Sequence, residues 1–132
     1  PYAVPVSYAY DGYKLYFHCA KSGHKIDAIR RNAKASFCVI DQDLVVPEEY
    51  TSYFRSIIAF GTIRILEDSQ EKREAIEKLA VKYAPDDNDA HRQAAIDRDW
   101  VPLCMLEMTI EHMTGKEAKE LIKEKQQRNK SC

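Results

Sequence analysis

A long stretch rich in β-branched and aromatic residues, Thr51 to Leu66, constrains the fold of this chain most strongly. The stretch has no helical periodicity, so we predict one long strand. Gly61 lies within it, and a glycine inside such a strand indicates a bulge or a sharp bend. A bend of this kind allows a sheet to curl into a barrel.

Shorter segments supply the other predicted strands. The first runs from Tyr2 to Tyr10 and is followed by Asp11-Gly12, which is a strong signal for a two-residue hairpin turn. The chain then returns from Tyr13 to Cys19 as the antiparallel partner. Two further strands are predicted at Lys34–Asp41 and at Cys104–Glu111. A polar loop at Asp43–Glu48 follows the first of them.

Helical patterns lie between and after these strands. Ile76, Leu79, Ala80 and Tyr83 repeat at helical spacing on a segment that begins near Asp68 and is stopped by Pro85. We predict two more helices, from Asp89 to Asp97 and after a capping box at Thr114–Glu117, and a frayed tail beyond Lys125. The predicted fold class is therefore mainly β with α, an antiparallel barrel with flanking helices rather than a doubly wound sheet.

Length and charge limit the function. The chain has 132 residues and a net charge of -1, which suits one domain over residues 1–132 and gives no reason to expect nucleic acid or a membrane as partner. No apolar run is long enough for a membrane span, so we expect a cytoplasmic protein. The chain starts at Pro1, and we expect that an upstream segment is missing.

The four cysteines indicate free thiols. They are widely separated and none forms a C-x-x-C pair, which indicates neither a disulfide framework nor a metal site. Cys19, Cys38 and Cys104 lie in predicted strands and are expected to be small core residues, whereas Cys132 is a tail residue.

The segment Leu15–Lys25 joins an aromatic strand to a helix start that is crowded with cations. With Ser22 as the N-cap, His24 and Lys25 occupy the first turn of a short helix that ends at Asn32 and Ala33. Backbone N–H groups, a cap hydroxyl and a lysine would converge there, which is the arrangement that binds a phosphate. The alternative is that His24 and Lys25 simply point into water.

Several motifs in order closely resemble a known family. They are Tyr2-Ala3-Val4-Pro5-Val6-Ser7-Tyr8, Leu15-Tyr16-Phe17-His18, Gly23-His24-Lys25 with Arg31-Asn32, and Tyr53-Phe54-Arg55-Ser56 before Phe60-Gly61. Together they resemble the pyridoxamine 5′-phosphate oxidase-like FMN-binding split barrels, and within these the NimA-like branch that is associated with 5-nitroimidazole resistance. The resemblance covers Pro1 to about Tyr83.

The resemblance implies a homodimer with two FMN sites at the subunit interface. It implies that Pro5, Val6, Ser7 and Tyr8 contact the flavin ring. His18, Cys19 and Ala20 would then pass beside the ribityl chain and the phosphate, and Lys25 would hold the phosphate, with His24 either assisting it or facing solvent.

Two further residues are candidates for the same site. Arg55 could pair with the phosphate or with a substrate carboxylate, or it could bridge to Glu48 or Glu49 at the rim of the barrel. Ser56 follows it on the predicted strand, where neighbours point to opposite faces, so at most one of the two is expected to face the cofactor.

The implied reaction is the reduction of a small oxidant, such as a nitroimidazole or another nitroaromatic, by FMN. His18 is the candidate catalytic proton donor, and a structural hydrogen bond is its alternative role. The other readings are a non-catalytic flavin-binding dimer, a haem protein that uses His91 or His112, and a pyridoxamine 5′-phosphate oxidase activity.

Overall fold

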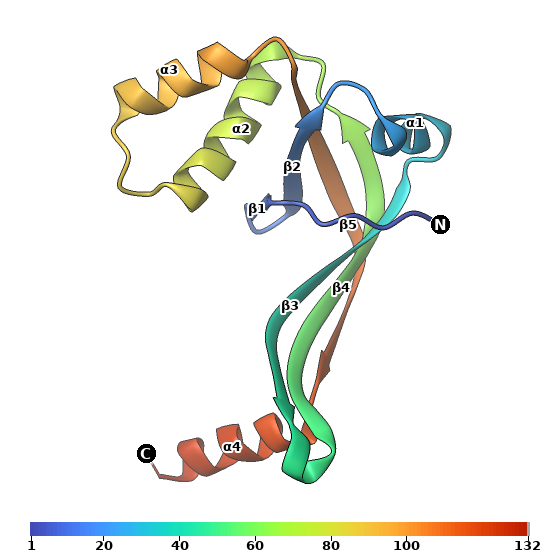
Figure 1. The fold of residues 1–132 in the computed structure, drawn as a ribbon, viewed down its shortest axis with the longest axis vertical. Helices are drawn as coiled ribbons and strands as arrows, with labels where there is room; N and C mark the ends of the chain where they lie inside the picture. Colours follow the sequence, from blue (N-terminus) through green and yellow to red (C-terminus); the bar gives the residue numbers. More distant parts are fainter. Residues whose placement is uncertain (132) are drawn as a thin grey trace. The chain divides into compact units, whose positions relative to one another are not determined.

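The computed structural model describes residues 1–131 and contains five strands, four α-helices and one 3₁₀ turn (Figure 1). In chain order these elements are β1 (Tyr8–Tyr10), β2 (Lys14–Ala20), α1 (His24–Arg31), β3 (Lys34–Val46), η1 (Pro47–Glu49), β4 (Thr51–Ile65), α2 (Ser69–Tyr83), α3 (Asp89–Asp99), β5 (Leu103–Glu117) and α4 (Lys119–Lys130). The strands form one antiparallel sheet in the order β1-β2-β5-β4-β3. Among the described residues, no helix has the length and apolar character that a membrane span needs.

The chain divides into two compact units. The first consists of residues 1–35 and 61–110, and the second of residues 36–60 and 111–132. Strands β4 and β5 are each divided between the two units, with one part of the strand in each.

The core of the first unit lies between the sheet and α2. Strand β2 pairs with β5 from Lys14↔Thr109 to Ala20↔Leu103, and Tyr16 and Met105 lie on the face that α2 covers. The core cluster on this face is Ala9, Tyr16, Leu66, Ala75, Leu79 and Met105. Neighbouring residues of a strand point to opposite faces, so the other face of the sheet carries Phe17 and Leu106, which are both almost fully buried.

Helices α2 and α3 start where the sequence predicts. The Asp68 carboxylate accepts a hydrogen bond from the backbone N–H of Glu71 at 2.9 Å, and the Asn88 side chain accepts one from that of His91 at 2.8 Å. A buried lysine joins the two helices, since Lys72 Nζ donates to the Trp100 carbonyl at 2.9 Å and lies 4.1 Å from the centre of its ring. Trp100 caps the C-terminus of α3, where a cation is favourable.

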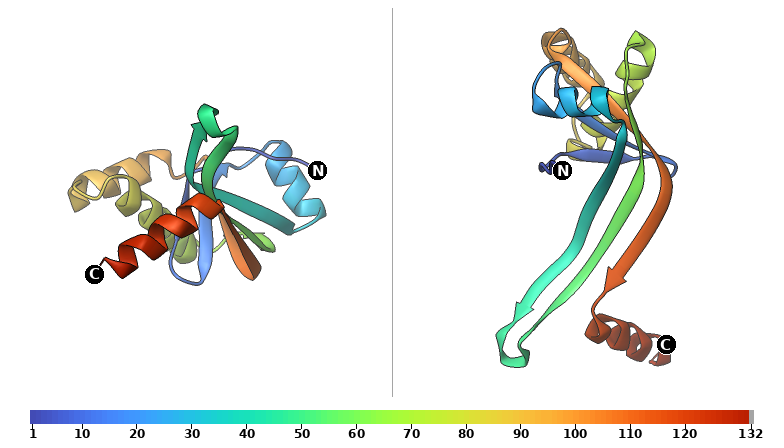
Figure 2. Two further views of the ribbon diagram at one scale, coloured as in Figure 1. Left: turned by 90° about the horizontal axis from the view of Figure 1, so that it is seen from below. Right: turned by 90° about the vertical axis from the view of Figure 1, so that its right-hand side faces the viewer.

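Ion pairs join the strands of the second unit. The guanidinium of Arg55 binds Glu117 on β5 at 2.9 Å and Asp41 on β3 at 2.7 Å, and Lys125 of α4 also reaches Glu117 at 2.9 Å. The long β3–β4 hairpin turns at η1 (Figure 2).

Several of the predicted element boundaries are wrong. Strand β1 begins at Tyr8 instead of Tyr2, and the two residues of the hairpin turn are Gly12 and Tyr13 instead of Asp11 and Gly12, because the Asp11 backbone N–H donates to the Lys14 carbonyl at 3.2 Å. Strand β3 continues beyond Asp41 to Val46. The predicted capping box at 114–117 is the end of β5, so α4 starts later, is preceded by Ala118, and extends beyond Lys125 to Lys130.

The cysteines also differ in part from the prediction. Cys104 is buried and Cys19 is half-buried, but Cys38 is exposed on β3. Cys132 lies outside the described residues.

Gly61 marks a close approach of two backbones. A Cβ atom at this position would lie 2.9 Å from the carbonyl carbon of Thr109 on β5, and it would overlap the carbonyl oxygen of the same residue. Only a residue without a side chain therefore allows β4 and β5 to approach this closely.

We expect Gly61→Ala to lower the free energy of unfolding by about 1–3 kcal/mol or more, because the backbone of β4 or β5 must move. Thermal or urea unfolding measures the change. Gly115→Ala is the matched control, because a Cβ there comes no closer than 3.9 Å to its nearest neighbour and should change stability by less than about 0.5 kcal/mol. Equal stability of the two variants would contradict the close approach.

Candidate functional site

The turn between β2 and α1 is the centre of the candidate site. Gly23, and not Ser22, is the N-cap of α1, and no side chain accepts a hydrogen bond from the first amides of the helix. Gly23 has φ 122°, a conformation that side chains disfavour. The predicted hydroxyl cap is thus wrong, but uncapped amides remain at the helix start. Asp27 lies in the same first turn and supplies one acidic group there.

The two basic residues of this turn differ in their surroundings. Lys25 is half-buried and lies near the thiol of Cys19, where its charge opposes the rise in the pKa of Cys19 that burial causes. The imidazole of His24 is exposed, and the centre of its ring lies 4.4 Å from that of Tyr2. Lys25 is therefore the better placed of the two to bind an anion at the helix start.

The segment Pro5–Tyr8 is held by the C-terminal end of α2. The backbone N–H of Tyr8 donates to the Tyr83 hydroxyl at 3.1 Å, and Lys82 Nζ donates to the Tyr8 carbonyl at 2.7 Å. The Lys82 ammonium also lies 3.3 Å from the centre of the Tyr8 ring. The backbone N–H and carbonyl groups of Tyr8 thus find their hydrogen-bond partners in side chains of α2. Before it, Pro5 has no N–H to offer to a sheet ladder.

The hydroxyl of Tyr83 responds to the same contacts. The hydrogen bond from the Tyr8 backbone lowers the pKa of Tyr83, and the charge of Lys82 acts in the same direction against a smaller effect of burial. The sequence does not predict the contacts of Lys82 and Tyr83 with Tyr8, because both residues lie more than seventy positions from Tyr8 along the chain.

The three candidates at the end of β2 do not share one face. His18 pairs with Met105 and Ala20 with Leu103 on the face that α2 covers, whereas Cys19 pairs with Cys104 on the opposite face. The His18 ring is exposed and has no hydrogen-bonding or ion-pair partner within residues 1–131. A single ligand can therefore contact the side chains of both rows only around the end of the strand.

Arg55 and Ser56 belong to the second unit, whereas the other candidates belong to the first. Arg55 forms ion pairs with Asp41 and Glu117, so of the alternatives for this residue a bridge to acidic side chains is formed, but with these two residues and not with Glu48 or Glu49. Glu49 instead accepts a hydrogen bond from the Tyr53 hydroxyl at 2.8 Å. Ser56 is half-buried on β4.

The remaining histidines have separate environments. The His91 ring lies 2.8 Å from a carboxylate oxygen of Asp87 in the first unit, and the His112 ring stacks on Phe60 in the second, with centres 6.0 Å apart. The two imidazoles belong to different units and have no partner in common among the described residues.

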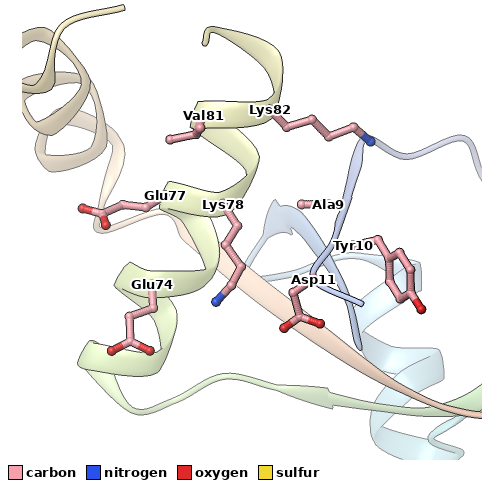
Figure 3. A pocket seen from close by; sticks show the side chains of 8 residues that line it. All are labelled: Ala9, Tyr10, Asp11, Glu74, Glu77, Lys78, Val81 and Lys82. Carbon is pink, nitrogen blue, oxygen red and sulfur yellow. The ribbon is translucent and has the colours of Figure 1, made fainter. Parts of the chain in front are cut away.

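A shallow groove of about 620 Å³ lies between β1 and one side of α2 (Figure 3). It carries both carboxylates and amines, and the Lys78 ammonium lies 4.9 Å from the centre of the Tyr16 ring. The lining residues are Ala9, Tyr10, Asp11, Glu74, Glu77, Lys78, Val81 and Lys82. None of the site residues predicted from the sequence lines this groove.

The family of the chain follows from its sequence as a whole. Residues 1–117 match the family described as pyridoxamine 5′-phosphate oxidase. The chain belongs to the pyridoxamine 5′-phosphate oxidase-like family. The predicted fold and family are thus confirmed at this level, with an antiparallel split barrel and four helices. No curated protein sequence matches the chain.

Solved structures share this fold. One is a candidate 5-nitroimidazole antibiotic resistance protein from Bacteroides thetaiotaomicron, with 25% identity and a TM-score of 0.67 over 87% of this chain and 68% of that one. A FAD-binding protein from Mesorhizobium loti has 22% identity and a TM-score of 0.63 over 90% and 78%. The FAD and haem binding protein from Mycobacterium smegmatis has 19% identity and a TM-score of 0.70 over 90% and 60%.

We expect Tyr83→Phe to loosen the start of β1 and the segment before it, because the Tyr8 amide loses its acceptor. The lost hydrogen bond contributes about 0.5–1.5 kcal/mol, so its loss should make hydrogen exchange in the N-terminal peptide about 2- to 10-fold faster. Mass spectrometry after deuterium labelling measures this rate. Tyr13→Phe is the control, since Tyr13 is 83% exposed. Unchanged exchange in Tyr83→Phe would show that other contacts hold the segment.

Proposed function

We propose that this protein is an FMN-dependent oxidoreductase that works as a cytoplasmic homodimer and reduces a small oxidant such as a nitroaromatic. The observation that carries the proposal is the start of α1, where uncapped backbone amides and the half-buried Lys25 meet. Such a helix N-terminus attracts a phosphate through its N–H groups and its dipole. FAD-binding and nitroimidazole-resistance descriptions among the structural relatives support a flavin and this substrate class.

Residues of the first unit have different roles in this proposal. Lys25 and the amides after Gly23 hold the phosphate, and the segment Pro5–Tyr8 positions the flavin ring with its backbone. The bound flavin would supply the electron transfer itself. His18 has an exposed ring without a protein partner in the described part of the chain, and it gives a proton to the reduced oxidant. Arg55 is left out of this binding set, since two carboxylates already engage it.

Exposed apolar side chains of the second unit support the homodimer. The single chain leaves Val45 65% and Tyr50 98% exposed, and such residues mark interaction sites when they gather on one element. Others on the same hairpin are Ile40, Leu44, Ile57, Ile58 and Phe60. A second copy that covers this hairpin would remove the apolar surface from water.

The proposal is tested first by the absorbance spectrum of the purified protein, before and after addition of FMN and gel filtration. Retained flavin bands would support it, and chromatography of the released cofactor would separate FMN from FAD. A colourless protein that does not retain FMN would overturn it. A Soret band would instead favour haem.

We expect Lys25→Ala to weaken FMN binding by about 10- to 100-fold, because one charged hydrogen bond to the phosphate is lost. Fluorescence titration measures the affinity, and light scattering should show an unchanged dimer. Riboflavin, which lacks the phosphate, should bind the variant and the wild type equally. Lys34→Ala changes the same charge on an exposed residue and should leave FMN affinity unchanged. An equal loss for riboflavin would remove the phosphate assignment.

We expect His18→Phe to slow reoxidation of the chemically reduced protein by a 5-nitroimidazole about 100-fold or more, while FMN affinity changes little. Stopped-flow absorbance measures the rate. His91→Phe is the control, because His91 is an exposed imidazole that is paired with Asp87. Loss of affinity in parallel with the rate would make His18 a binding residue and not a proton donor.

A further inference from the structure

Two cysteines lie side by side on adjacent strands of the first unit. Cys19 on β2 and Cys104 on β5 are direct partners in the antiparallel register. Direct partners project to the same face, so both thiols lie on the face that also carries Phe17 and Leu106. Both cysteines are free thiols in the structure.

The spacing of such a pair suits a disulfide. Opposed residues of an antiparallel pair have Cα atoms about 4.5–5.5 Å apart, and disulfides span about 4.4–6.8 Å between Cα atoms. Their Cβ atoms are about 4.5–5.5 Å apart, slightly more than the range of about 3.5–4.5 Å in disulfides. The bond would therefore form after a small movement of the strands, and the resulting strain would make it easy to reduce.

The surroundings of the pair favour the thiol form at rest. Burial and the neighbouring Cys104 raise the pKa of Cys19 to about 11, although the charge of Lys25 acts against this rise. Cys104 is 5% exposed, whereas Cys19 is only half-buried. A small oxidant would thus meet Cys19 first, and the raised pKa of Cys19 makes this reaction slow at neutral pH.

We propose that Cys19 and Cys104 are a modification site, at which hydrogen peroxide converts the two thiols into a reversible intrachain disulfide. The Cys19 sulfur attacks the peroxide, so that an S–O bond forms, the O–O bond breaks and one water leaves. The Cys104 sulfur then attacks Cys19, so that the S–S bond forms, the S–O bond breaks and a second water leaves. Each sulfur loses one electron and the peroxide gains two.

This site does not depend on the proposed flavin. The bond would join the end of β2 to the start of β5, immediately before the turn that leads to α1. Exposed Cys38 belongs to the second unit and has no register partner of this kind on β2 or β5.

The test treats the full chain carrying Cys38→Ser and Cys132→Ser with hydrogen peroxide, so that only the proposed pair remains. We expect the protein to lose the mass of two hydrogen atoms and to lose both alkylatable thiols. Methionine oxidation adds mass and is thereby distinguished. Non-reducing trypsin digestion should join peptide 15–21 to peptide 99–116, and dithiothreitol should separate them. The same joined peptides are expected from the wild-type chain.

Three outcomes would overturn the proposal. They are two thiols that remain alkylatable after peroxide, a sulfinic acid at Cys19, and a link between two chains in place of one within a chain. Cys19→Ser in the same background provides the negative control and should give no joined peptides. If that variant does not fold, the result for the wild-type chain still decides.

Discussion

The antiparallel register between β2 and β5 is the constraint on which the first unit depends. It places Tyr16 and Met105 on the side of α2 and leaves Phe17 and Leu106 on the other side. A shift by one residue would exchange the two rows and would expose the core cluster to water. The same register brings Cys19 to Cys104 and separates both from His18. The packing of α2, the candidate site and the thiol pair therefore have one common origin.

A buried carboxylate shows how firmly this register is specified. Glu107 on β5 is 6% exposed and binds Lys14 of β2 at 3.0 Å and Arg64 of β4 at 2.9 Å. Burial raises the pKa of Glu107, but hydrogen bonds from Arg64 and Lys14 outweigh burial and hold it below its usual range. Its contribution to stability is thus present above the ordinary glutamate pKa and is lost as the pH falls through the lowered value. In another register the carboxylate would be buried without partners, which is costly.

Local signals in the sequence predicted the elements better than their ends. Asp68 gives the start of α2 correctly, because the side chain that caps the helix lies in the same segment. The pattern at 114–117 also matches a cap, but the chain is strand there, since Glu117 pairs with Arg55 and the Ala118 amide donates to the Phe54 carbonyl at 2.9 Å. These partners lie about sixty residues away. Long-range pairing therefore overrides the local pattern at this point.

The sequence predicts which segments contribute to the candidate site, but it does not predict how their side chains are arranged in space. The alternation of His18 and Cys19 is visible in the sequence, yet it does not say which row faces which helix. In the structure Lys25 lies near Cys19, whereas His18 lies in the opposite row. A ligand held by Lys25 can reach His18 only around the end of β2, at residues 21–23. A long cofactor with a phosphate at one end and a ring at the other could span this corner, whereas a free phosphate could not.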